Sequence, residues 1–232
     1  FLVVIQLGAI LAVAVMYFQK LNPFSPSKSA RQKQATWALW IKIVIACIPA
    51  AVLGLLFDDW MEAHLYNAYV VAATLIIYGV LFIVLENSSI TANPSITKVG
   101  HVSTKTALFI GLFQLLSLVP GTSRSGSTIL GAMVLGCSRG VAAEFSFFLG
   151  IPVMFGASFL KLVKFFVKGN VLTGPQIFYT ILGMAIAFGV SVYSIQFLMG
   201  YVRRHDFKFF GYYRIILGVV VLAYFGITAL AA

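Results

Sequence analysis

Charged side chains are scarce in this sequence, and acidic ones are the scarcest. Only 9% of its 232 residues are Asp, Glu, Lys or Arg, whereas roughly a quarter are charged in an ordinary globular domain. With 61% hydrophobic residues, the composition excludes an ordinary soluble domain and places the chain in a membrane. The six acids and three histidines also leave few side chains for holding a metal ion or acting as a general base.

Cysteine is equally scarce, and the basic residues are scattered. Cys47 and Cys137 both lie inside apolar runs, where a thiol behaves as a small buried hydrophobe, so we predict no disulfide. The net charge of +10 comes from sixteen Lys and Arg that lie mostly near the ends of apolar runs, as membrane topology requires. We therefore infer no nucleic-acid binding from this charge.

Long apolar runs are what the sequence has in abundance. A helix needs about 20 residues to cross a hydrocarbon core of about 30 Å, and it satisfies its own backbone hydrogen bonds in lipid. The predicted fold class is all-α, a polytopic integral membrane protein with about six transmembrane helices in a single membrane domain, residues 1–232. The expected spans are 1–18, 37–57, 66–86, 140–167, 174–200 and 209–231.

A pair of shorter apolar segments lies between the third and fourth spans. Residues 104–118 and 127–137 are each too short to cross a bilayer comfortably at about 1.5 Å per residue, and Pro120 and Gly121 separate them. We predict a re-entrant helix-turn-helix hairpin over about 104–137 with its polar turn inside the membrane. Non-helical backbone is tolerated at that depth only where protein or a water-filled cavity surrounds it.

Charge bias predicts the side of the membrane on which each loop lies. Residues 19–36 carry four Lys or Arg and no acid, whereas 58–64 carry three acids and no Lys or Arg. The first loop is expected in the cytoplasm and the second outside. A re-entrant hairpin then places the basic residues at 203–208 in the cytoplasm and those at 161–168 outside, whereas a single broken crossing would exchange these clusters.

The turn between the two short segments reads VPGTSRSGST, at residues 119–128. Pro120 ends the first half-helix because it lacks an N–H group, and Gly121 permits backbone angles that a side chain would forbid. Ser125 or Ser127 is expected to cap the second half-helix. The unpaired N–H groups and the dipole at that helix start favour an anion.

Arg124 makes the expectation of an anion site stronger. An arginine at bilayer depth costs roughly 2.5–3.5 kcal/mol, so it is expected to be paired or functional. Its planar fork of donors matches two phosphate oxygens, and the hydroxyls of Ser123, Ser125 and Thr128 add further donors. The alternative is a surface loop whose arginine reaches the lipid headgroups, but the short apolar segments on both sides favour a phosphate cradle.

The same turn has the glycine spacing of a P-loop. Four residues separate Gly121 from Gly126, and Ser127 and Thr128 follow. The lysine and the preceding strand of a P-loop are both lacking. We therefore reject a nucleotide-binding P-loop.

At these residues the sequence resembles the undecaprenyl pyrophosphate phosphatase family of the bacitracin-resistance type. PGTSRSGST is similar to the signature of that family, and three other stretches match it: IQLGAILAV near the start, IPAAVLGLLF at 48–57 and SRGVAAEFSFFLGIPVM at 138–154. The resemblance implies hydrolysis of undecaprenyl diphosphate to undecaprenyl phosphate and inorganic phosphate. That reaction recycles the carrier lipid for cell-wall synthesis and gives bacitracin resistance. It also implies the bacterial cell (inner) membrane.

The resemblance further implies an inverted-repeat architecture with two re-entrant hairpins. VVIQLGAI at 3–10 and SFFLGIP at 146–152 form a faint internal echo of such a repeat. The earlier hairpin of the family carries two glutamates, a serine pair and a histidine, and nothing in this sequence matches it. We therefore expect the chain to be truncated at its N-terminus, with its first repeat incomplete.

Residue roles follow from the same resemblance. Arg124 is expected to hold the diphosphate, and Ser123, Ser125 and Thr128 match the hydroxyl positions of the signature as its other catalytic residues. The expected substrate-binding residues are Pro120, Gly121, Thr122, Gly126, Ser127 and Glu144. Glu144 fits equally well as an acid that pairs with an arginine for packing.

Cofactor and partners are expected from the family as well. A divalent cation, Mg or Ca, is expected, but its ligands are not identifiable in this chain, since His64, His101 and His205 are predicted to be surface residues. The expected partners are the polyprenyl diphosphate lipid and membrane lipids, with a homo-oligomer left open.

Two other functions compete with that of a phosphatase. Broken helices around an anion site are also a transporter design, so a transporter or flippase of an anionic polyprenyl lipid is the alternative. A non-catalytic scaffold is the third possibility.

Overall fold

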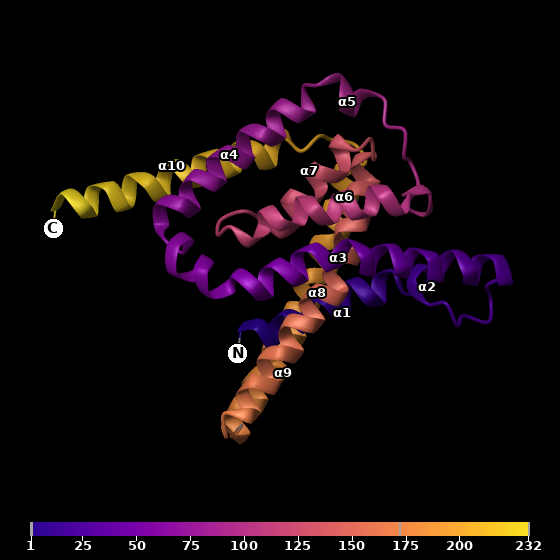
Figure 1. Ribbon diagram of the computed structural model, residues 1–232, viewed down its shortest axis with the longest axis horizontal. Coiled ribbons are helices and arrows are strands. Elements are labelled where there is room, and N and C mark those ends of the chain that lie inside the picture. The colour runs from indigo at the N-terminus through magenta and orange to yellow at the C-terminus, as the bar shows by residue number, and fades with distance from the viewer. Residues whose placement is uncertain (1, 172, 232) are drawn as a thin grey trace. The chain divides into compact units, whose positions relative to one another are not determined.

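The computed structural model describes residues 2–171 and 173–231, and helices are its regular elements (Figure 1). This confirms the all-α prediction. The helices are α1 (Leu2–Met16), α2 (Phe18–Leu21), α3 (Ala30–Leu65), α4 (Ala68–Glu86), α5 (Ser89–Ala92), α6 (Thr104–Leu115), α7 (Arg124–Val134), α8 (Arg139–Val167), α9 (Gly174–Val202) and α10 (Lys208–Ala231), with 3-10 turns η1 (Val99–His101) and η2 (Leu116–Leu118).

Five helices in the described ranges are long and apolar enough to cross a membrane, in α3, α4, α8, α9 and α10. This confirms a polytopic membrane protein. The expected first span, 1–18, is a shorter helix: α1 has 15 residues, or about 22 Å at 1.5 Å per residue. It stops at Met16 because Tyr17 leaves helical geometry, with φ −106° and ψ 18°.

Helix α3 differs most from its prediction. The span expected at 37–57 is part of a helix of 36 residues that contains Pro49, and the acidic stretch 58–64, expected in a loop, is helical. No Gly or Pro follows Gly54 before Leu65, and Met, Glu, Ala and Leu there are good helix formers. A proline inside the helix is tolerated because membrane helices satisfy the freed backbone groups locally or through neighbours.

The described residues form two compact units. The first comprises 1–44 and 147–201. Within it α1 packs closely on α9, since a Cβ on Gly8 would lie 2.1 Å from the carbonyl oxygen of Met184. The Ser158 hydroxyl of α8 donates to the carbonyl of Val3 at 2.8 Å.

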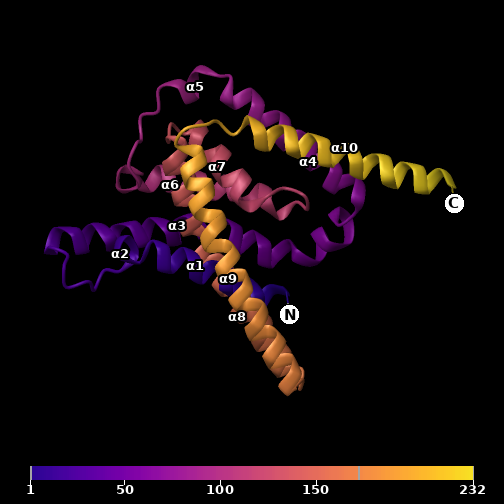
Figure 2. The same ribbon diagram turned by 180° about the vertical axis from the view of Figure 1, so that it is seen from behind.

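The second unit comprises 45–146 and 202–232. Within it, α4 and α10 pack against each other along much of their length. The two helices run side by side in both ribbon views (Figure 2). A Cβ on Gly79 would lie 2.7 Å from the Gly211 carbonyl oxygen, and one on Gly218 would lie 2.9 Å from that of Ala72. Glycine therefore allows the close backbone approach that is common between membrane helices.

The same unit contains the predicted helix-turn-helix hairpin, formed by α6, η2 and α7. A Cβ on Gly131 of α7 would lie 2.4 Å from Cγ of Phe113 on α6, so the two arms pack tightly. The second arm begins at Arg124 rather than at residue 127 and ends at Val134. It begins earlier because a serine ahead of the predicted ones caps it, as described below.

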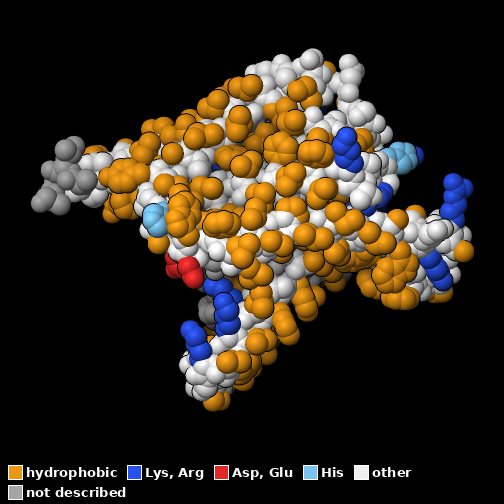
Figure 3. All heavy atoms as spheres, in the orientation of Figure 1, with side chains coloured by type: hydrophobic (Ala, Val, Ile, Leu, Met, Phe, Trp, Pro, Cys, Tyr) orange, Lys and Arg blue, Asp and Glu red, His pale blue; other side chains and the backbone are white. Residues whose placement is uncertain are grey.

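Large apolar side chains cover much of the surface. Leu55, Leu56 and Tyr193 are 72%, 70% and 72% exposed, values typical of side chains that face lipid. Figure 3 shows hydrophobic side chains over most of the visible face, with Lys and Arg confined to a few places. Neither cysteine is in a disulfide bond, and Cys137 is buried while Cys47 is half-buried.

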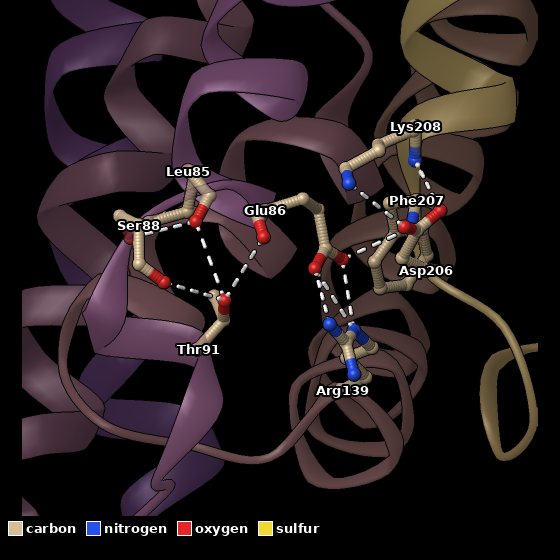
Figure 4. Close-up of polar contacts among 8 residues, drawn as sticks. All are labelled: Leu85, Glu86, Ser88, Thr91, Arg139, Asp206, Phe207 and Lys208. Atoms are coloured by element: carbon tan, nitrogen blue, oxygen red, sulfur yellow. Dashed lines mark hydrogen bonds and ion pairs between the residues drawn. The ribbon is translucent and has the colours of Figure 1, made fainter.

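Glu86, the last residue of α4, joins three segments of the second unit (Figure 4). Its carboxylate accepts hydrogen bonds from Nε of Arg139 at 2.9 and 3.0 Å, and from Nη2 of the same guanidinium. The backbone N–H of Phe207 donates to it at 2.9 Å. One carboxylate thus connects the end of α4, the start of α8 and the residue before α10.

We predict that Gly218→Val lowers the thermal unfolding midpoint of the protein in detergent. Its side chain would meet Ile76 and the backbone of Ala72 at under 3.0 Å, and overpacking of this kind costs about 1–3 kcal/mol. The matched control is Gly226→Val in the same helix, where a Cβ meets no described atom within 4 Å. Equal midpoints for the two variants would contradict the close packing of α4 and α10.

The Glu86–Arg139 pair predicts an asymmetric response to mutation. Arg139→Met leaves the fully buried Glu86 carboxylate without its cation, so we expect a loss of about 3 kcal/mol in the free energy of unfolding. Glu86→Gln should cost less, because Gln still accepts from Phe207 and the Arg139 side chain, 34% exposed, reaches solvent. Denaturant titration in micelles measures both values, and the reverse order would refute the interpretation.

Candidate active site

The polar turn at 119–123 leaves the helix at Pro120 and Gly121. Gly121 has φ +82°, in the left-handed region that favours glycine. A Cβ there would also lie 2.3 Å from Oγ1 of Thr74 and 2.6 Å from the carbonyl oxygen of Val71. Backbone angle and close approach to α4 both require glycine at this position.

Two carbonyl oxygens of the turn are held by side chains from other helices. The Thr74 hydroxyl of α4 donates to the Pro120 carbonyl at 2.8 Å. Nη2 of Arg214, on α10, donates to the Gly121 carbonyl at 2.9 Å. The two carbonyl oxygens are therefore paired with donors from α4 and α10. This pairing weakens their repulsion of an anion at the turn.

Ser123 caps α7, which corrects the prediction that Ser125 or Ser127 would do so. Its φ of −64° and ψ of 128° are extended, and its Oγ accepts from the N–H of Gly126 at 3.2 Å. A cap must precede the first helical residue, so that its oxygen reaches an N–H group two or three residues on. Ser125 already lies inside the helix, with its Oγ 3.1 Å from that of Ser123.

Arg124 is the first residue of α7 and is half-buried. Its Nη1 donates to the carbonyl of Ser146 on α8 at 3.3 Å, which fixes the direction of the guanidinium. The group carries five N–H donors in a planar fork. It therefore lies beside the positive end of a capped helix, where an anionic group would meet both.

Ser127 and Thr128 are fully buried and support the helix. Both hydroxyls donate to the carbonyl of Arg124 at 3.0 Å, and Oγ1 of Thr128 lies 2.7 Å from Oγ of Ser146. By contrast, Ser123, Arg124 and Ser125 are half-buried. These three side chains, like Pro120 and Gly121, are more exposed than Ser127 and Thr128, whose direct contact with a substrate stays a prediction.

The remaining predicted residues surround this turn in various ways. Thr122 is 7% exposed, and its side chain lies next to that of Tyr78. Gly126 is buried, and a Cβ added to it would lie 3.1 Å from the Cβ of Ser123. Glu144 is 8% exposed and lies on α8, two residues before Ser146. The roles assigned to these three residues stay predictions.

The donor set at the turn does not fit a metal ion. Across 2–171 and 173–231, no three His, Cys, Asp or Glu side chains gather closely enough to hold one. The charged side chains at the turn, Arg124 and Arg214, are both cationic. His64, His101 and His205 are exposed, as predicted, although His64 lies in α3 rather than in a loop.

Comparison with known proteins decides the family. The family model described as bacitracin resistance protein BacA matches residues 1–220. The chain belongs to this BacA family. Similar curated proteins include undecaprenyl-diphosphatases of Streptococcus thermophilus, 58% identical over 97% of this chain and 78% of the relative, of Streptococcus mutans, 57% over 97% and 80%, and of Enterococcus faecalis, 54% over 97% and 81%.

Two residues that bond the turn of this BacA family member were missed by sequence reasoning. Arg214 carries the signal that singled out Arg124, a permanent charge inside an apolar span, which is a functional hypothesis by default. Thr74 carries no such signal, because a lone threonine in a span usually bonds its own helix, as this one also does with Val70 at 3.0 Å.

We predict that Thr74→Val loosens the turn. Losing the bond to Pro120 removes about 1 kcal/mol, so amide hydrogen exchange in a peptide covering 115–128 should be about fivefold faster. The control is Thr228→Val on α10, whose hydroxyl bonds carbonyls of its own helix at 3.0 and 3.1 Å. Exchange unchanged in Thr74→Val would show that the turn does not depend on this bond.

Proposed function

We propose that this protein hydrolyses undecaprenyl diphosphate to undecaprenyl phosphate and inorganic phosphate. Curated relatives with that activity in their name are 54–58% identical over nearly the whole chain. The structural observation that carries the proposal is the position of Arg124, half-buried at the first residue of a capped helix and bonded to Ser146 of α8.

The turn acts on the terminal phosphate. Arg124 bonds two of its oxygens, while the N–H groups at the start of α7 and the hydroxyls of Ser123 and Ser125 donate to the others. Whether a serine or a water attacks first, the net reaction replaces the bridging oxygen on the terminal phosphorus with a water oxygen. Undecaprenyl phosphate leaves with the bridging oxygen, inorganic phosphate keeps the water oxygen and one of its protons, and the other proton passes to solvent.

The donors contribute most in the transition state. Phosphoryl transfer spreads negative charge over the three equatorial oxygens of the phosphoryl group, and preoriented donors stabilise that charge without reorganising. The bonds from Thr74 and Arg214 to the turn carbonyls keep opposing dipoles paired. Thr74 and Arg214 thus act on the reaction by positioning the turn.

Location and cofactor complete the proposal. We assign the protein to the bacterial inner membrane, where the carrier lipid is used for cell-wall synthesis. A divalent cation would be bound with the substrate, through diphosphate oxygens and water, and would neutralise part of the phosphate charge. The described residues supply no ligand cluster for it.

Replacing Arg124 tests the proposal directly. In protein expressed from its complete coding sequence, Arg124→Ala should lower kcat/KM for phosphate release from undecaprenyl diphosphate by about 10²–10³-fold, the usual effect of losing one transition-state donor. Arg124→Lys should recover only part of the activity, since it keeps the charge but not the fork.

Arg31→Ala is the matched control, because that arginine is exposed in the first turn of α3. Normal turnover by Arg124→Ala would show that Arg124 is not an active-site residue. Movement of the lipid across vesicle membranes without phosphate release by the unaltered protein would instead indicate a transporter of an anionic polyprenyl lipid.

A further inference from the structure

An apolar groove of about 250 Å³ lies beside the hairpin in the second unit. Its walls come mainly from α4, the first arm of the hairpin and α7, with Ser88 and Ile90 at the α5 end. They include Tyr78 and Leu81 of α4, Phe113 and Leu116 of the first arm and the turn after it, and Leu130 and Val134 of α7.

The groove begins next to the polar turn. Leu116 lies three residues before the turn begins, and the ring of Tyr78 lies 5.7 Å from the Arg214 guanidinium that bonds the Gly121 carbonyl. Leu130 and Val134 continue the wall along α7, away from Arg124. From Arg124 to Val134 the helix rises about 15 Å at 1.5 Å per residue.

Polar contacts fix the walls at both ends. Near the turn, Thr74 of α4 bonds the Pro120 carbonyl at 2.8 Å. At the other end, Glu86 of α4 bonds Arg139, five residues after the end of α7 (Figure 4). The tight contact of Gly131 with Phe113 fixes α7 against the first arm. The groove is therefore preformed.

We propose that this groove binds the isoprenoid chain of the substrate where it leaves the diphosphate. The inference rests on the proposed function, because Tyr78 and Leu116 bring one end of the groove next to the turn that holds the diphosphate in that proposal. The lining is apolar apart from Tyr78 and Ser88, which suits a hydrocarbon without donors or acceptors. An ordinary phospholipid keeps its headgroup at the membrane surface, so its acyl chain does not begin at the turn.

In this proposal the groove recognises the isoprenoid chain of the substrate, while the turn recognises the diphosphate. Bilayer tails are as apolar as the groove, so its attraction comes from packing contacts rather than from removal of water. Filling it with a protein side chain should weaken binding of the long-chain substrate and leave the chemistry at the turn unchanged.

The test compares Leu81→Trp with Val80→Trp. The two residues are adjacent on α4 and both are 45% exposed, but Leu81 lines the groove and Val80 does not. Leu81→Trp should raise KM for undecaprenyl diphosphate by about tenfold, a packing effect of the size seen in apolar pockets. Its kcat, and its inhibition constant for inorganic diphosphate, should stay within about twofold of those of Val80→Trp.

A second measurement uses the unaltered protein, so it does not depend on whether the tryptophan variants fold. The unaltered protein is photolysed with a diazirine-bearing polyprenyl diphosphate, and peptides of α4 and α7 that line the groove should be labelled. Excess undecaprenyl diphosphate should displace the label, while equal phosphatidylglycerol should not. Displacement by both lipids would show that the groove holds any lipid chain and would overturn the proposal.

The outcomes separate this inference from the proposed function. Equal KM values in Leu81→Trp and Val80→Trp, with phosphate still released, would overturn the groove alone. Specific displacement of the label without any phosphate release by the unaltered protein would support the groove and refute the phosphatase.

Discussion

The polar turn depends on one constraint, that backbone carbonyls leaving a helix among apolar segments must find other donors. The carbonyls of Pro120 and Gly121 find them in Thr74 and Arg214, and the N–H of Gly126 finds an acceptor in Ser123. Both donors come from the closely packed pair α4 and α10. The glycines at 79 and 218, where a Cβ would approach backbone within 3.0 Å, are thus part of what maintains the turn.

This arrangement decides the charge that the turn presents. The carbonyls of Pro120 and Gly121 are paired with donors on α4 and α10, and Arg124 adds a guanidinium at the first residue of α7. The buried carboxylate of Glu86 lies at the other end of α4 and is neutralised by Arg139.

Sequence reasoning succeeded where the signal is local. The spans expected at 66–86 and 140–167 appear as 68–86 and 139–167, because hydropathy and helix length are properties of contiguous residues. The expectation that the first arm ends at Pro120 also holds, since η2 ends at Leu118, and Pro49 lies inside a helix as the span 37–57 implied. Sequence reasoning failed on the helix cap. Ser123, not Ser125 or Ser127, caps α7 because neighbouring serines differ only in where the helix begins.

The sequence by itself determined that this is a helical membrane protein with a broken hairpin and an arginine at its turn, since composition, run length and the PGTSRSGST stretch suffice for that. Only the tertiary structure decided which groups stabilise the turn and which hydroxyls are buried. Thr74 and Arg214 lie 46 and 93 residues from the carbonyls that they bond. The Thr128 hydroxyl lies 2.7 Å from that of Ser146 on α8, a contact made across 18 residues of sequence. Contacts between distant segments depend on helix packing, which local sequence patterns do not encode.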